Sequence, residues 1–538
     1  MLAHELLRAS LMLAALVPAS LVLAALFVTR RNPFGSALSV TSIIIPLAVA
    51  SVVLRSASSI CSTLGFMADG ATIASMLRGL VQVDIVSGPM LLLVCTLGLV
   101  VTRYSTTYLR SEPGLVRYAR SLLLTLAAVT LLVISNHLGV IIAAWLATGI
   151  GLHQLLTFYR TRRQAVIVAH KEFLLSRLAD LFFFASIYLI DSDVGSLHID
   201  VINQFVAKRG GLTAGLHLAT TLLVVGVLLK SAQLPFHGWM QQVMEAPTPV
   251  SALLHAGIVN IGGFVMIRLA PLMAHAPLAQ SMLLGVGLVT AIVASLVMTK
   301  RASIKLYLAW STIAQMGFML VQCGLGVWHL ALLHLLAHSC YKAHCFLTSG
   351  GAVDVWRGAS LVRSPRPSLR LTTLALGVLA LAAAPFYVAI TRTKLHIPPS
   401  LGPLALALGL SFVPTIARAL AAGRRAFATA LGFTAGATAL YFALHVAFDG
   451  FVPAIGAEAD SPYMWTVVTA GLVLLFVVQT LLKTHSGGRF ASLIQPHLRS
   501  GLYLDEWFMR LTFRIWPPRL ERTVTSRRSR GAGAQEVE

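Results

Sequence analysis

Several ionisable residues lie inside segments of the sequence that are otherwise apolar. Lys230 ends one such run and Lys305 begins another, while His334, His338 and Lys342 recur at four-residue spacing, which places them on one helix face. Each charge inside a membrane helix costs about 2.5–3.5 kcal/mol, so it needs a reason to be there. A lysine removed from water can exchange a proton near neutral pH, and histidine titrates there already. Such groups, joined by water, predict a path for protons.

A proline-rich segment separates Lys230 from the next apolar run. Pro235 interrupts the predicted helix and frees backbone carbonyls, which a membrane tolerates only where they line a cavity or are buried in protein. His237 follows this break, and His255 lies within the next apolar run. Glu245, between them, has two interpretations: an acid at the mouth of the path, or a cap on the following helix.

Other interpretations of these residues predict different chemistry. A single lysine can extend to the membrane interface, but several groups, with Lys230 and Arg392 both close to prolines, favour a functional path. The cations could instead attract an anion such as bicarbonate directly, through Lys230, His255, Lys342 and Arg392. A metal site among the histidines and cysteines of residues 334–345 is disfavoured, because Lys342 would repel a cation.

The elements that must position these residues are apolar runs of about 20 residues, each long enough to cross a membrane core of about 30 Å. The chain is 57% hydrophobic and only 11% charged, against about 25% charged residues in soluble domains. We therefore predict an all-α polytopic membrane protein with about 15 membrane helices (13–16). The runs are 7–28, 36–55, 85–102, 118–135, 138–158, 172–190, 213–232, 249–271, 279–299, 305–325, 327–350, 371–391, 401–421, 427–447 and 464–482.

The net charge of +22 is spread over short loops between these runs rather than gathered in a groove that could bind nucleic acid. Most basic loops fall on one side of the predicted topology. In a bacterial inner membrane this places the N-terminus outside and the C-terminus on the cytoplasmic side. Lys208 and Arg209 are the exception. The five cysteines form no CxxC pair and are interpreted as packing residues.

Residues 484–538 have a different composition, with nine arginines against five acids. They form a basic cytoplasmic tail with an amphipathic stretch at Leu502–Trp516, which predicts either contact with the anionic leaflet or docking of a soluble partner.

The segment Lys230–His255, with its motif Met244-Glu-Ala-Pro-Thr-Pro-Val-Ser-Ala-Leu-Leu, resembles the antiporter-like membrane subunits of respiratory complex I and of Mrp antiporters. The resemblance continues through Lys305 and Ala309-Trp-Ser-Thr-Ile-Ala-Gln-Met-Gly to Lys342, and covers roughly residues 80–395. It implies two inverted five-helix repeats with broken seventh and twelfth helices. The expected divisions are 1–110 (first three helices), 111–260 (first half-channel), 261–400 (second half-channel), 401–483 (last helices) and 484–538 (tail).

The resemblance also implies a role for individual residues. Lys230 is the central lysine of the first half-channel, His255, His338 and Lys342 continue the polar axis, and Arg392 stands where the family usually has a lysine. Arg177 and Asp180 match the family's charged pair on the sixth helix, although an ordinary intrahelical ion pair has the same spacing.

One departure from the family concerns the residue after Trp145. Family members carry a glutamate there that pairs with the central lysine, whereas this chain has Leu146. Lys230 would then lack its counter-charge, and His153, two turns further on, is the predicted substitute.

This departure and the length of the chain narrow the resemblance to DabB, the membrane subunits of two-component DAB inorganic-carbon accumulation systems. No long lateral amphipathic helix is expected. The resemblance implies no cofactor or catalysis in this chain, and a large peripheral DabA-like zinc partner resembling a carbonic anhydrase on the cytoplasmic side. Proton flow, rather than sodium flow, would drive that partner. The alternatives are a proton-pumping subunit of complex I, a hydrogenase or an Mrp antiporter, and a stand-alone anion transporter.

Overall fold

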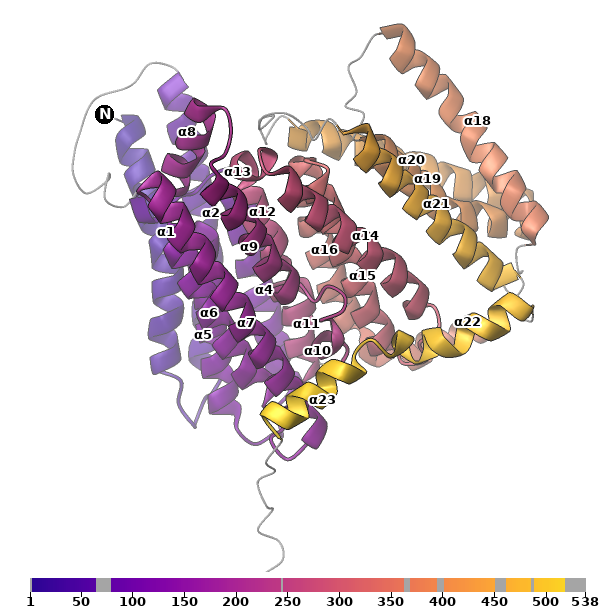
Figure 1. The fold of residues 1–538 in the computed structure, drawn as a ribbon. Helices are drawn as coiled ribbons and strands as arrows, with labels where there is room; N and C mark the ends of the chain where they lie inside the picture. Colours follow the sequence, from indigo (N-terminus) through magenta and orange to yellow (C-terminus); the bar gives the residue numbers. More distant parts are fainter. Residues whose placement is uncertain are drawn as a thin grey trace, which may run out of the picture.

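The computed structural model describes residues 2–63, 79–242, 245–361, 368–393, 401–449, 461–484 and 488–517. Throughout these ranges the chain forms helices that pack side by side in an elongated bundle (Figure 1). The helices are α1 (Leu2–Leu26), α2 (Gly35–Thr63), α4 (Ser87–Tyr108), α5 (Leu115–Ile134), α6 (Leu138–Leu156), α7 (Arg163–Val194), α8 (Ile199–Arg209), α9 (Ala214–Lys230), α10 (Gly238–Gln242), α11 (Thr248–Ala256), η2 (Ile258–Asn260), α12 (Ile261–Arg268), α13 (Ala270–Ala274), α14 (Pro277–Met298), α15 (Ile304–Gly324), α16 (Trp328–Leu347), η3 (Ser349–Gly351), α17 (Ala352–Leu361), α18 (Leu369–Thr393), α19 (Leu401–Ala422), α20 (Arg424–Asp449), α21 (Pro462–Thr484), α22 (Arg489–Arg499), η4 (Gly501–Tyr503) and α23 (Glu506–Ile515).

The predicted membrane runs correspond to helices. Within the described residues, 12 helical segments are long and apolar enough to span a membrane, and Ala214–Lys230 and Leu369–Ala383 are shorter apolar helices. The more polar α16 accounts for the remaining predicted run. The prediction of an all-α, multi-pass membrane protein is therefore confirmed.

The predicted break after Lys230 is present. Helix α9 ends at Lys230 and α10 begins at Gly238. Part of the intervening backbone is bonded within the protein, because the Leu234 amide donates to the Thr290 hydroxyl at 3.2 Å and the Gln233 amide to the Leu228 carbonyl at 3.3 Å. The next span is interrupted as well, where η2 separates α11 from α12. Sequence analysis did not predict that second interruption.

A break in the twelfth membrane helix is not seen. Helix α18 is continuous from Leu369 to Thr393, so the broken twelfth helix that the resemblance implies is wrong for this segment. A proline alone does not end a helix here, since α1, α2 and α19 each contain one in their interior. Neighbouring helices can satisfy the freed carbonyl.

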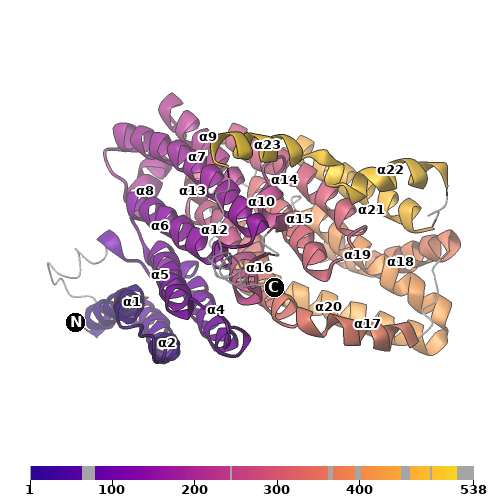
Figure 2. The same cartoon turned by 90° about the horizontal axis from the view of Figure 1, so that it is seen from below.

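The C-terminal segment crosses the flank of the bundle. Helix α22 contacts α14 and α21, and α23 contacts α7, so together they span helices that are far apart in sequence (Figures 1 and 2). The predicted amphipathic stretch is helical, with Phe508 and Thr512 buried and Trp507 and Ile515 exposed. A lateral amphipathic element is thus present as two short helices of 11 and 10 residues.

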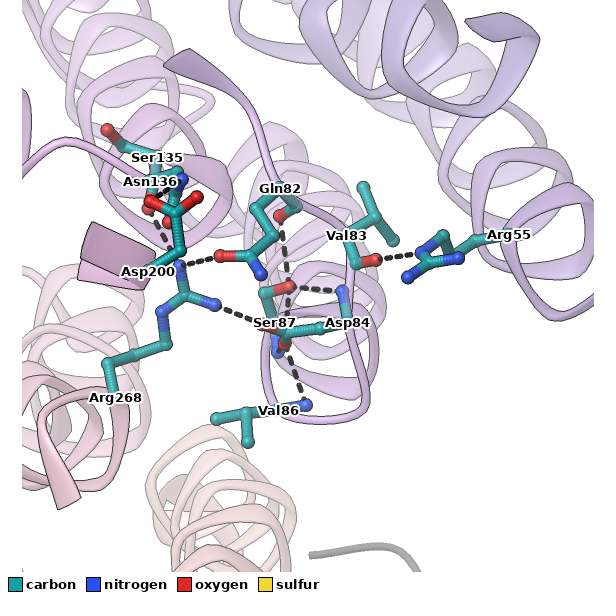
Figure 3. Close-up of polar contacts among 10 residues, drawn as sticks. All are labelled: Arg55, Gln82, Val83, Asp84, Val86, Ser87, Ser135, Asn136, Asp200 and Arg268. Atoms are coloured by element: carbon teal, nitrogen blue, oxygen red, sulfur yellow. Dashed lines mark hydrogen bonds and ion pairs between the residues drawn. The ribbon is translucent and has the colours of Figure 1, made fainter. Parts of the chain in front are cut away.

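At the end of the bundle opposite α23, the buried Arg268 forms an ion pair with the partly exposed Asp84 (Figure 3). Arg268 also donates to the Gln82 side chain at 3.1 Å and to the Ser135 carbonyl at 3.0 Å. One Asp84 oxygen accepts the Ser87 amide at 2.7 Å, at the start of α4. This network ties α12 to α4 and to the α5–α6 connection.

We expect Asp84→Asn to destabilise the protein by about 2 kcal/mol, because it leaves Arg268 buried without its counter-charge. Burial alone would raise the pKa of Asp84, but Arg268 and the hydrogen bonds from Ser87 and Val86 outweigh burial and hold that pKa below its ordinary value. A lowered pKa stabilises the protein above the unfolded-state pKa of about 4, and this contribution is lost as the pH falls through the folded-state pKa.

Thermal unfolding of the purified protein in detergent, measured from pH 7 down to pH 4, tests this expectation. The stability difference between the native protein and Asp84→Asn should persist over this whole range, because its loss begins only below the unfolded-state pKa of about 4. Asp191→Asn, at an exposed acid on the same end, is the matched control. Equal melting temperatures for the two variants would contradict a stabilising role of the Asp84–Arg268 pair.

Candidate functional site

The first polar cluster forms around Lys230, where α9 ends against α7. Its Nζ lies 2.8 Å from Oδ1 of Asp180, and the second oxygen of Asp180 lies 3.0 Å from Arg177. The side chains of Lys230 and Asp180 are only 5% and 4% exposed. The rings of Trp145 and Phe183 stand 5.2 and 5.7 Å from the ammonium group. Asp180 therefore bridges two cations in an aromatic-walled, water-poor site.

A small cavity adjoins this cluster. It is lined by residues of α6, α7, α9, α10 and η2, including Lys230, Glu172, Ser176 and Trp239. Its space for water-sized molecules is about 20 Å³, which is enough for about one ordered water molecule. Glu172 is only 5% exposed, and its Oε2 has no hydrogen-bond partner among the described residues. The cavity thus places a carboxylate beside the central lysine.

Sequence analysis did not single out Glu172, although its spacing held a signal. Glu172, Ser176 and Asp180 recur every four residues, which places them on one face of α7. An acid within an apolar run that shares a face with the charged pair is a candidate for the same site.

The expectation that Lys230 lacks a counter-charge is wrong. Leu146 does replace the family's glutamate, but Asp180 pairs with Lys230 directly. His153 does not line the cavity. Its Nδ1 lies 3.1 Å from the Ala169 carbonyl, and its ring faces His170 and Trp516 near the C-terminal segment. Because α7 presents its acids toward α9, the compensating carboxylates come from the sixth membrane helix instead of the fifth.

The second polar cluster lies between α11 and α16. Lys342 is fully buried and donates to the Leu308 carbonyl at 3.2 Å, and within the described part of the chain no acid pairs with it. His255 stacks on Phe346 at 4.3 Å between ring centroids. Nδ1 of His255 and both ring nitrogens of His338 are buried with no protein partner in the described ranges. Such groups are usually satisfied by water, so this cluster suits proton exchange.

Other predicted residues lie around the two clusters. His334 contacts Gln322 through Nδ1 at 2.8 Å and lies 6.0 Å from His338 between ring centroids. Lys305 donates to the Thr248 hydroxyl at 2.8 Å. The buried His237 lies in the break after α9, with Nδ1 3.2 Å from the Pro235 carbonyl.

One predicted residue, Glu245, lies apart from these clusters, and another, Arg392, has a side chain outside the described part of the structure. Glu245 is partly exposed and approaches Arg162 at 3.9 Å. That position is beside the α6–α7 connection, and Glu245 does not cap α11, which has no side-chain cap. Arg392 lies in α18, but its side chain is outside the described part of the structure.

The fold and these clusters define a multi-pass membrane subunit of the antiporter-like class, and the comparisons agree. The family described as "NADH:quinone oxidoreductase/Mrp antiporter, TM" matches residues 135–392, and "NADH-Ubiquinone oxidoreductase (complex I), chain 5 N-terminus" matches residues 80–119. An Mrp complex structure from Dietzia sp. aligns with a TM-score of 0.59 at 23% identity, covering 95% of this chain and 60% of the matched chain. That likeness supports the fold.

Closer relatives are inorganic carbon transporter subunits. The probable subunit DabB2 of Halothiobacillus neapolitanus is 38% identical over 437 residues, which cover 79% of this chain and 78% of that protein. The probable subunit DabB of Hydrogenovibrio crunogenus is 38% identical over 439 residues, covering 80% and 82%. The chain belongs to the DabB family, within the wider complex I and Mrp antiporter-like group, and the predicted resemblance is confirmed.

Proposed function

We propose that this chain is the membrane subunit of an energy-coupled inorganic-carbon uptake complex, in which cation flow through it drives a peripheral partner. The observation that carries the proposal is the buried Lys230–Asp180 pair beside a water-sized cavity. A lysine in such a site can change its charge as a proton passes. The transported substrate, inorganic carbon, is inferred from the relatives, which are named as inorganic carbon transporter subunits.

The cation is a proton. Sodium binding requires several oxygen ligands free of competing cations. In the first cluster Lys230 and Arg177 occupy the two oxygens of Asp180, and the second cluster is built from lysine and histidine. Both clusters therefore favour proton exchange over sodium coordination.

The partner is a large DabA-like zinc protein resembling a carbonic anhydrase, and it carries the catalysis. The α1–α2, α6–α7 and α14–α15 connections contain Arg30, Arg160 and Lys300, and they lie at the end of the bundle where α23 lies (Figure 1). By the positive-inside rule, this end lies on the cytoplasmic side of a bacterial inner membrane. The basic end is then available to the partner.

Labelled inorganic-carbon uptake in cells that lack carbonic anhydrase tests the proposal. Cells would express this chain with and without the candidate partner, before and after a protonophore, and in medium with and without sodium. Uptake that needs both proteins, collapses with the proton gradient and ignores sodium is expected. Uptake by this chain alone would favour the anion-transporter alternative and overturn the two-subunit reading.

A second candidate function is that of a proton-pumping antiporter-like subunit of complex I, a hydrogenase or an Mrp antiporter. The two family matches favour it, because they span residues 80–119 and 135–392 and include both polar clusters. It predicts no inorganic-carbon uptake under any of these conditions although both proteins are expressed. It also predicts co-purification with energy-converting subunits.

A further inference from the structure

Two carboxylates lie near Lys230, but only one of them forms ion pairs. Asp180 uses one oxygen for Lys230 and the other for Arg177, at 2.8 and 3.0 Å. Glu172 is equally buried and lines the cavity with Lys230; it accepts a hydrogen bond from Ser176 but forms no ion pair within the described residues. Protonation of Asp180 would therefore break two ion pairs, whereas protonation of Glu172 would break none.

A buried carboxylate without a direct ion pair is costly even when it accepts one hydrogen bond, so Glu172 needs a physical reason to be retained in this position. A second fixed counter-ion is the simplest reason, yet Asp180 already neutralises one of the two cations in the cluster. With Lys230 and Arg177 charged and both acids ionised, the cluster carries no net charge. If one proton moves from Nζ of Lys230 to a carboxylate oxygen of Glu172, the lysine and the glutamate become neutral together. The net charge of the cluster is again zero.

That balance makes proton exchange inexpensive in a water-poor site, because no net charge has to be buried or released. The fixed charges that face the exchanging pair are Asp180 and Arg177 on α7, and both interact electrostatically with Glu172. The cavity supplies space for one bridging water molecule.

We propose that Glu172 is the proton-exchange partner of Lys230, while Asp180 and Arg177 form the fixed charged frame of the site. The inference rests on the proposed function of proton conduction. It gives the sixth membrane helix the carboxylate that exchanges protons with Lys230, because Leu146 leaves the fifth helix without one. The proton leaves Lys230 Nζ, passes through the cavity and arrives on Glu172; no other bond forms or breaks.

Glu172→Gln keeps the shape of the side chain and removes the acid, so proton-driven uptake should fall at least about tenfold. Glu172→Asp keeps a carboxylate and should retain uptake within about threefold of the native chain. Asp191→Asn, at an exposed acid of the same helix, is the matched control and should leave uptake unchanged. Protein abundance in the membrane is measured for each variant. Native uptake by Glu172→Gln, in an assay where Lys230→Met is inactive, would overturn the inference.

Infrared difference spectroscopy during pH titration of the reconstituted chain tests the exchange without any carbon transport. The native chain should show a protonated-carboxyl C=O band that appears on acidification and is missing in Glu172→Gln. In Lys230→Met the same band should persist at high pH, because Glu172 then has no exchange partner and stays neutral. A carboxyl band unaffected by both substitutions would overturn the inference. If the chain transports no inorganic carbon at all, the proposed function fails while this spectroscopic result still decides the role of Glu172.

Discussion

Lys230→Met is expected to reduce proton-driven inorganic-carbon uptake by about 100-fold, to the background of cells without the chain, which is within the range for loss of a group that transfers a proton. Methionine retains much of the length and the apolar stem of lysine, so contacts with Trp145 and Phe183 can persist. Only the ammonium group disappears from the centre of the first cluster. Uptake with the partner present is the measurement.

The structure also explains why this variant should still fold. Without Lys230, Asp180 keeps its ion pair with Arg177 at 3.0 Å, so the substitution does not strand a lone carboxylate. Membrane abundance should therefore match the native chain. Lys208→Met, at an exposed lysine in the last turn of α8, is the matched control and should retain native uptake. Native uptake by Lys230→Met at equal abundance would exclude Lys230 from the ion path.

Local sequence information was sufficient for the positions of the membrane helices and for the break after Lys230. Membrane spans are set by length and hydropathy, and Pro235 removes a backbone donor wherever it stands. The break that the resemblance implied for the twelfth helix is absent although that helix contains Pro385, because the outcome depends on which neighbours cover the freed carbonyl. Whether a proline breaks a membrane helix is thus a tertiary property.

The partners of Lys230 show a second limit of sequence reasoning. Helix α7 is apolar on most of its surface, so periodicity does not reveal which side faces α9. Asp180 was assigned to Arg177 from their spacing, and that pair exists, but its second contact with Lys230 depends on the rotation of α7 against α9. Glu172 was missed for the same reason. The resemblance directed attention to the fifth helix and to His153, whereas packing places the acids on the sixth.

The ion pair between Lys171 and Asp505 attaches the C-terminal segment to the bundle and leads to the second large prediction. Nζ of Lys171 is fully buried and lies 2.6 Å from both oxygens of Asp505. Asp505 also packs against the backbone at Gly238, where a β-carbon would overlap its Oδ1. Phe508, one turn further on, packs beside Phe236. One acid thus joins α23, the start of α7 and the break after α9.

Asp505→Asn is expected to cost about 3 kcal/mol, because it leaves the Lys171 ammonium buried without a counter-charge. The lost stability should mainly allow α23 to detach from the bundle, rather than unfold the whole protein, since α23 has few other buried side chains. Amide hydrogen exchange across Glu506–Ile515 should accelerate about 100-fold, which corresponds to that free energy, while exchange in α14 and α15 stays slow. Thermal unfolding in detergent gives the global component.

Two matched variants separate the ion pair from a general effect of charge near α23. Glu506→Gln removes the neighbouring acid, which forms only an exposed pair with Arg510 at 3.6 Å, and should cost less than about 0.5 kcal/mol. The double variant Lys171→Met with Asp505→Leu removes both buried charges and should recover most of the lost stability, because the penalty comes from the unpaired charge. If the double variant is as unstable as Asp505→Asn, then the close packing of Asp505 against Gly238, rather than the ion pair, attaches the C-terminal segment to the bundle. The same variants then show whether uptake needs α23 fixed against the break, since the double variant restores the attachment without the charges.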